Sequence, residues 1–147
     1  MTTLLLDTGP LVGWLDASDH LHPWCVETFA GFGSPLVTCE AVLTEACYLL
    51  RATHNAPDRI LEMVQLGGIV VQSLMPEEAS AVRVLLRQYE DQEMDFADAC
   101  LVRLSELHPH SRVITADVQD FRVYRRNGRQ TIPLITPPAG PWKQQMS

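Results

Sequence analysis

The sequence predicts a three-layer α/β/α domain with a mainly parallel sheet. Short apolar runs of strand length alternate with segments whose apolar residues recur at helical spacing, from a first run at 3–7 to a last run at 131–135. The 147 residues, of which 46% are hydrophobic and 20% charged, are enough for one domain with a substantial core. Strands that alternate with helices form parallel sheets with helices on both faces.

The N-terminal segment predicts one strand followed by two helices. Three consecutive leucines form a buried strand at 3–7, which ends on the carboxylate of Asp7. The turn Thr8-Gly9-Pro10 begins a helix, because proline suits the first helical turn and Asp7 or Thr8 can cap it. Asp19 is expected to cap the next helix, which glycines end.

The middle of the chain predicts two strands that enclose two helices. The strand at 35–39 leads into an apolar helix for which Thr38 is the expected N-cap. Pro57 opens another helix, and Gly67-Gly68 stops it. The apolar segment after these glycines is the third strand.

The C-terminal half predicts two more helices and two more strands. Acids after Pro76 suit the first turn of one helix, and Asp95 begins the next. The fourth strand ends on Asp117, and the last contains Pro133, which suits a sheet edge. We expect one domain over residues 1–136 and a loose tail at 137–147. The expected strands are 3–7, 35–39, 68–74, 112–117 and 131–135, and the expected helices are 10–17, 20–32, 39–54, 57–66, 76–91 and 95–107.

The composition limits the class and the compartment of the protein. A formal net charge of −7 does not suggest a nucleic-acid binder, but the charge is unevenly distributed. Residues 1–50 contain six acids and no Lys or Arg, whereas no acid follows Asp120. No apolar run approaches the ~20 residues of a membrane span and no signal peptide is evident, so we expect a cytoplasmic protein without membrane association.

The four cysteines are expected to be buried free thiols. They form no C-x-x-C pair and lie in apolar helical patterns. Two His-x-His pairs have no further ligands at zinc-like spacing, so a zinc site is not expected.

Four acids lie where a purely structural role is unusual. Asp7 and Asp117 each end a strand, and the carboxyl ends of parallel strands meet at one edge of a sheet. Glu45 and Asp98 lie in apolar helical segments, where a carboxylate is costly unless it is paired or binds a cation. Clustered carboxylates repel one another, so together they indicate a site for Mg²⁺ or Mn²⁺ that activates water for phosphodiester cleavage.

Each of these acids also has a structural explanation. Asp95 can cap its helix with Asp98 at the N3 position, Glu45 can lie on an exposed helix face, and Asp117 can begin a turn. The chain contains no P-loop, nucleophile elbow or cysteine–histidine signature that would offer another chemistry. The hypothesis of a metal site therefore depends on the combination of acids.

A basic segment directly follows the last of these acids. Residues 121–129, FRVYRRNGR, contain four arginines and no acid. Guanidinium groups bind phosphate and aromatic rings stack on unpaired bases, so this segment is expected to contact RNA. The alternatives are a solvated basic loop or a docking site for an acidic partner. The expected RNA-binding residues are Arg122, Tyr124, Arg125, Arg126 and Arg129.

Four motifs resemble those of the PIN domain in their order and spacing, namely LLLDTGPLVGWLD, TEACYLL, MDFADACLVRLSE and VITADVQDF. The likeness is to VapC-type toxin ribonucleases and spans about residues 3–135. It implies a Mg²⁺-dependent ribonuclease that leaves a 5′-phosphate, is often a homodimer and is inhibited by a small antitoxin.

The resemblance also assigns roles to residues. It implies that Asp7 and Asp98 ligate the metal, that Asp117 completes the site, and that Glu45 binds the metal or orients the attacking water. Thr115 is the hydroxyl that accompanies the fourth acid, Asp95 is an accessory acid, and Phe121 serves packing.

We therefore expect a metal-dependent endoribonuclease that is the toxin of a type II toxin–antitoxin pair and acts on RNA. The alternatives are a solitary PIN-type RNA-processing nuclease, a PIN domain without activity, and a non-catalytic binding or signalling module with an acidic pocket. A phosphatase of the haloacid-dehalogenase type needs a second acid where Gly9 stands, and a receiver-like domain needs a late lysine beside its pocket, whereas the single lysine is Lys143.

Overall fold

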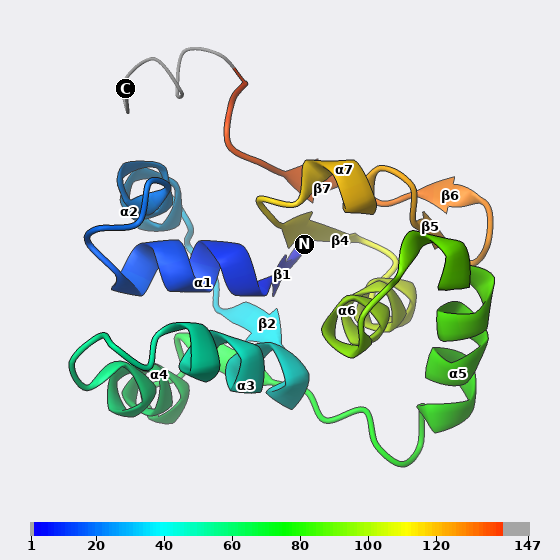
Figure 1. The fold of residues 1–147 in the computed structure, drawn as a ribbon, viewed down its shortest axis with the longest axis horizontal. Coiled ribbons are helices and arrows are strands. Elements are labelled where there is room, and N and C mark those ends of the chain that lie inside the picture. The colour runs from blue at the N-terminus through cyan, green and yellow to red at the C-terminus, as the bar shows by residue number, and fades with distance from the viewer. Residues whose placement is uncertain (1, 140–147) are drawn as a thin grey trace.

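The computed structural model describes residues 2–139 and contains a five-stranded parallel sheet (Figure 1). Its strands are β1 (Thr3–Leu6), β2 (Leu36–Thr38), β3 (Ile69–Val71), β4 (Ser111–Ile114) and β7 (Leu134–Ile135). They are arranged in the order β3-β2-β1-β4-β7, and every neighbouring pair is parallel. The predicted α/β fold class with a parallel sheet is confirmed.

Helices cover both faces of this sheet because its strands are apolar on both sides. Along β1, Leu5 packs into one core cluster with the helices at 79–88 and 96–107, whereas Leu4 and Leu6 pack into a second cluster with the first two helices. This alternation follows from the two-residue period of a strand. The helices are α1 (Thr8–Leu15), α2 (His22–Ala30), α3 (Glu40–Leu49), α4 (Ala56–Gln65), α5 (Ala79–Gln88), the 3-10 helix η1 (Glu90–Gln92), α6 (Phe96–Leu107) and α7 (Val118–Phe121).

Two predicted helix caps are wrong. Thr38 stays in β2, where its hydroxyl donates to the carbonyl of Leu6 at 2.8 Å, so it links two strands and caps nothing. Asp19 accepts from the backbone N–H of Leu21 at 2.9 Å and therefore orders the turn before α2, whose first residue is His22. Asp7 does cap α1, which begins at Thr8.

The C-terminal region is more divided than the sequence predicts. The expected strand at 131–135 is two strands, of which β6 (Gln130–Thr131) pairs with β5 (Arg125–Arg126) in an antiparallel hairpin and β7 lies at the edge of the main sheet. Neither this hairpin nor α7 was predicted. Residues 140–147 of the expected loose tail, including Lys143, lie outside the described residues.

The strand order places a topological switch point between β1 and β4. The chain leaves β1 toward β2 on one side, and β4 lies on the other side, so neighbouring connections diverge at this point. Ligands of open α/β sheets bind at such a switch point, outside the carboxyl ends of the strands. The residues after these two strands, Asp7 and Thr115, are therefore the first to consider for a site.

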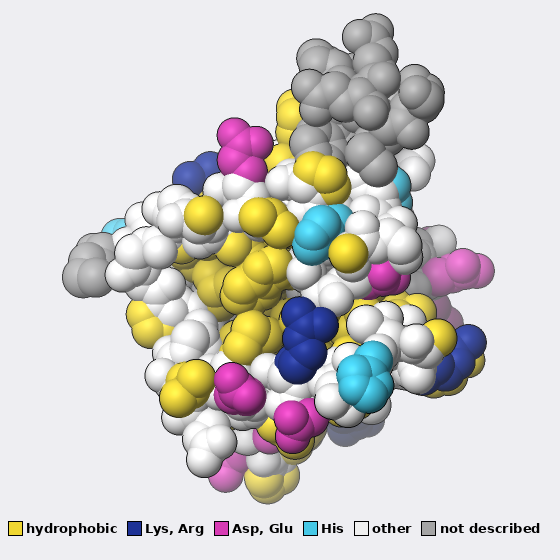
Figure 2. Space-filling model, turned by 90° about the vertical axis from the view of Figure 1, so that its left-hand side faces the viewer, with side chains coloured by type: hydrophobic (Ala, Val, Ile, Leu, Met, Phe, Trp, Pro, Cys, Tyr) yellow, Lys and Arg dark blue, Asp and Glu magenta, His cyan; other side chains and the backbone are white. Residues whose placement is uncertain are grey.

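Other surfaces of the molecule are apolar in part. On the face of α1, α2 and α4, hydrophobic side chains gather in a hollow with charged side chains at its rim (Figure 2). A groove between α1 and α4 is lined by Trp14, Leu15, Arg59, Glu62 and Met63. Within residues 2–139, no helix has the length and apolar character to cross a membrane.

Candidate metal centre

Asp7 connects the ends of the two central strands. It follows β1 and is only 7% exposed. One of its carboxylate oxygens accepts from the N–H of Thr8 at 2.7 Å, and the other accepts from the hydroxyl of Thr115 at 2.7 Å. The hydroxyl of Thr115 in turn accepts from the N–H of Asp117 at 2.9 Å. These bonds fix the Asp7 carboxylate at the switch point of the sheet.

Burial makes Asp7 an unusually weak acid. The pKa of Asp7 is raised from 3.8 to about 6, mainly by desolvation and to a smaller degree by the charges of Glu45 and Asp117, although the bonds from Thr115 and Thr8 act in the opposite direction. The carboxylate therefore lies close enough to two other acids to be repelled by them.

Asp98 reaches the same place from α6. Asp95 is the N-cap of this helix and accepts from the N–H of Asp98 at 2.8 Å, so the capping explanation of Asp95 is correct. The Asp98 carboxylate accepts from the hydroxyl of Tyr124 at 2.9 Å. Burial and then the charge of Asp7 raise the pKa of Asp98 to about 8. Capping thus serves the helix, while the side chain of Asp98 faces other acids.

The short helix α7 contributes a pair of acids. Asp117 caps it and accepts from the N–H of Asp120 at 3.2 Å. Carboxylate oxygens of Asp98, Asp117 and Asp120 lie within 4.8 Å of one another. Partial burial and the neighbouring Asp117 raise the pKa of Asp120. Asp120 was not predicted as a site residue, but its spacing of three from Asp117 would have suggested it had the helix been recognised.

These acids line one open cavity of about 500 Å³. Glu45 of α3 lies in its wall, so the structure brings together all four acids that the sequence singled out. Sequence analysis missed three further titratable residues of the lining, His20, Glu93 and Asp120. The seven acids of the wall are Asp7, Glu45, Glu93, Asp95, Asp98, Asp117 and Asp120.

The expected RNA contacts of Tyr124 and Arg126 are wrong. Tyr124 is completely buried, and its ring packs edge-on against Tyr89 and Phe121, so no base can stack on it. Arg126 is 4% exposed, and its guanidinium donates to the carbonyls of Pro109 and Ser111 at 2.8 and 3.0 Å. Both side chains serve packing within the fold.

The other arginines of the basic segment stay accessible to different degrees. Arg125 is half-buried and donates to backbone carbonyls of its own segment. Arg122 and Arg129 are exposed. The segment is therefore not one continuous basic surface, and its two exposed arginines are Arg122 and Arg129.

The fold and the acid cluster define the class of protein. The family model of the PIN domain matches residues 4–127, and the chain belongs to this family. Within it, the chain is similar to Ribonuclease VapC26 of Mycobacterium tuberculosis, with 24% identity over 127 residues that cover 85% of this chain and 94% of the relative.

Solved structures agree with this assignment of the fold. The structure of Mycobacterium tuberculosis VapC20, described as a sarcin-ricin loop cleaving toxin, superposes with a TM-score of 0.69 at 17% identity and covers 76% of this chain and 87% of its own. A toxin–antitoxin complex from Klebsiella pneumoniae gives a TM-score of 0.66 at 16% identity, and the match covers 92% of this chain and 98% of the chain in that complex. The likeness to VapC toxins is thus distant in sequence and extends over most of the fold.

Proposed function

We propose that this protein is an endoribonuclease that requires Mg²⁺ or Mn²⁺. The convergence of seven acids in one cavity carries this proposal, because no Lys or Arg lies among the described residues of the wall. Carboxylates held together without a counterion also repel one another, and after burial the charges of neighbouring acids are a further cause of the raised pKa of Asp7 and of Asp98. A divalent cation relieves this repulsion.

The donor set suits a hard cation. Asp98, Asp117 and Asp120 offer three mutually close oxygens, and Asp7 lies beside them through its contact with Thr115. The buried hydroxyl of Thr8, also in the wall, has no hydrogen-bond partner among the described residues. All-oxygen ligation favours Mg²⁺ or Mn²⁺ over zinc. When bound, such an ion polarises a phosphoryl oxygen and lowers the pKa of water.

The protein residues then have separate tasks. Asp98, Asp117 and Asp7 hold the cation, with Asp120 as an additional ligand. Thr115 fixes Asp7, and Tyr124 fixes Asp98. Glu45 of α3 lies in the same wall, close enough for its charge to raise the pKa of Asp7, and it orients the attacking water or accepts its proton.

Cleavage of a fluorescent single-stranded RNA tests the proposal. Asp98→Asn and Asp117→Asn should each abolish Mg²⁺-dependent cleavage, and EDTA should abolish that of the wild type. Asp58→Asn, an exposed acid on α4, is the matched control and should cleave normally. Cleavage by Asp98→Asn at the wild-type rate in Mg²⁺ would exclude the assigned centre.

The relatives support a more specific role as the toxin of a type II toxin–antitoxin pair, with a small antitoxin as partner and a homodimer as the assembly. Expression of the wild type alone should arrest bacterial growth, and Glu45→Gln should relieve the arrest. Normal growth at high soluble expression would favour a solitary RNA-processing nuclease instead.

A further inference from the structure

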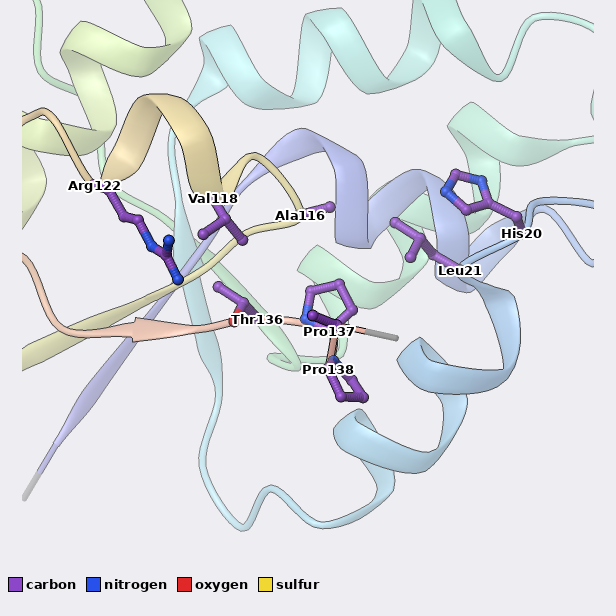
Figure 3. Close-up of a pocket in the computed structure, with 9 residues that line it drawn as sticks. His20, Leu21, Ala116, Val118, Arg122, Thr136, Pro137 and Pro138 are labelled. Carbon is purple, nitrogen blue, oxygen red and sulfur yellow. The ribbon is translucent and has the colours of Figure 1, made fainter. Parts of the chain in front are cut away.

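A second cavity adjoins the metal centre. It has a volume of about 540 Å³, within the range of small-molecule sites, and three residues line both cavities, namely His20, Leu21 and Ala116. Its remaining walls come from α7 and from the segment after β7 (Figure 3). A polymer bound at the metal centre can therefore continue into this cavity without leaving the surface of the protein.

The helix α7 separates the two cavities. Asp117 and Asp120, three residues apart, line the acidic one. Val118 and Arg122, four residues apart, line the second one and both extend from α7 toward Thr136 and the prolines that follow it (Figure 3). Residues three and four apart share a helix face, so one short helix presents carboxylates to one side and an apolar and a cationic side chain to the other.

The chemistry of the second cavity is opposite to that of the first. Acids line the metal centre, but none lies among the described residues of the second wall, which is formed mainly by Leu21, Ala116, Val118, Pro137 and Pro138. Arg122 lies at one end and His20 at the other. The guanidinium of Arg122 is exposed and forms no ion pair or hydrogen bond with any residue from 2 to 139. A cationic group beside an apolar pocket fits a ligand with an anionic group next to a flat apolar face.

We propose that this cavity binds one unpaired nucleotide of the RNA, directly beside the phosphate that is cleaved. The base lies against Val118 and Pro137, and Arg122 binds the phosphate of the same nucleotide. This inference rests on the proposed ribonuclease function. Unpaired bases are recognised by apolar contact and stacking, and arginine is suited to phosphate. The base pocket therefore contributes to the choice of the cleaved bond.

Abasic substrates test the proposal in the full-length protein. The bond that the wild type cleaves in a mixed single-stranded RNA is mapped first, and the base on each side of it is then removed in turn. Removal of one of these two bases should lower kcat/KM about tenfold, because a stacked base contributes roughly that much to binding. Val118→Phe fills the cavity and should lower kcat/KM for the intact RNA similarly, with no further loss on the abasic RNA. Val123→Phe, an exposed position outside the cavity, is the matched control.

The outcomes separate the two proposals. The proposed base pocket is rejected if the wild type cleaves RNA but tolerates both abasic sites, or if Val118→Phe remains as sensitive to them as the wild type. In both cases the proposed ribonuclease function is retained. If the wild type cleaves no RNA, the proposed function is wrong. Titration with the four nucleoside 5′-monophosphates, followed by NMR, then tests whether the cavity binds a nucleotide. Shifts of the Leu21 and Ala116 methyl signals that Arg122→Ala removes would support it, and unchanged signals would reject it.

Discussion

Asp7→Asn should stabilise the metal-free protein, although it removes a residue of the proposed centre. Burial raises the pKa of Asp7 from 3.8 to about 6 in the folded state. Below pH 3.8 the acid is neutral in both folded and unfolded chains, so its full contribution to stability is present. As the pH rises toward 6, only the unfolded chain ionises freely, and this contribution is lost. Asparagine has no charge to desolvate and keeps an oxygen that accepts hydrogen bonds.

The magnitude follows from the change in pKa. A rise from 3.8 to about 6 corresponds to about 3 kcal/mol at pH 8, since each pKa unit is worth about 1.4 kcal/mol. This value is an upper limit, because the amide must also replace the bonds of Thr8 and Thr115. At pH 5 the folded carboxyl is mostly protonated, and about half of the gain should remain.

Urea denaturation in EDTA, followed by circular dichroism at pH 8 and pH 5, measures this gain. Asp58→Asn is the control and should leave the free energy of unfolding within about 0.5 kcal/mol of the wild type. Addition of Mg²⁺ should reverse the order of stability at pH 8, because only the wild type gains binding free energy in full. A variant less stable than the wild type in EDTA at pH 8, or a gain independent of pH, would refute the reasoning.

Three further predictions concern the C-terminal residues. Tyr124→Phe removes a hydrogen bond that lowers the pKa of Asp98, so the acidic limb of the pH–rate profile of RNA cleavage should move to higher pH. An unchanged profile would show that Tyr124 does not position Asp98. Arg126→Ala leaves buried carbonyls without their donor and should lower the free energy of unfolding by about 2–4 kcal/mol in urea, whereas exposed Arg129→Ala should change it by less than about 0.5 kcal/mol. Replacing Arg122 and Arg129 together by Ala should reduce the slope of log binding constant against log salt concentration for RNA by about 0.7 for each phosphate that these side chains neutralise. Equal slopes for variant and wild type would show that these residues do not bind RNA and would favour a contact with a protein partner.

The parallel sheet could be predicted because each of its main strands is an apolar run between helical patterns. The elements that escaped prediction are short. A four-residue helix such as α7 has no complete hydrophobic period, and two-residue strands such as β5 and β6 have no alternation to detect. Thr38 was assigned to a helix cap because threonine favours that position, but its hydroxyl bonds Leu6 across the sheet instead.

The acids could be predicted because a carboxylate conflicts with an apolar context. Asp98 stands out for that reason and Asp7 because it ends an apolar strand, and both are buried enough for their pKa to rise. Asp120 lies in the polar sequence around α7, where an acid is not unusual and gives no sign of a functional role. Its role depends on a helical turn that brings it beside Asp117, and only the three-dimensional structure supplies that turn.

The basic segment was interpreted wrongly for an instructive reason: charge in the sequence does not reveal which side chains point inward. The hydroxyl of Tyr124 bonds Asp98, the N–H of Arg125 donates to the hydroxyl of Tyr89 at 2.8 Å, and Arg126 bonds Ser111 at the start of β4. Consecutive residues thus attach the hairpin to α6, to the end of α5 and to the sheet. The charge of Asp7 raises the pKa of Asp98, whereas the bond from Tyr124 lowers it, so this bond favours the ionised carboxylate. We infer that residues 124–126 serve the proposed metal centre by holding α6 against the sheet, and that the proposed contact of this segment with RNA is left to the exposed Arg122 and Arg129.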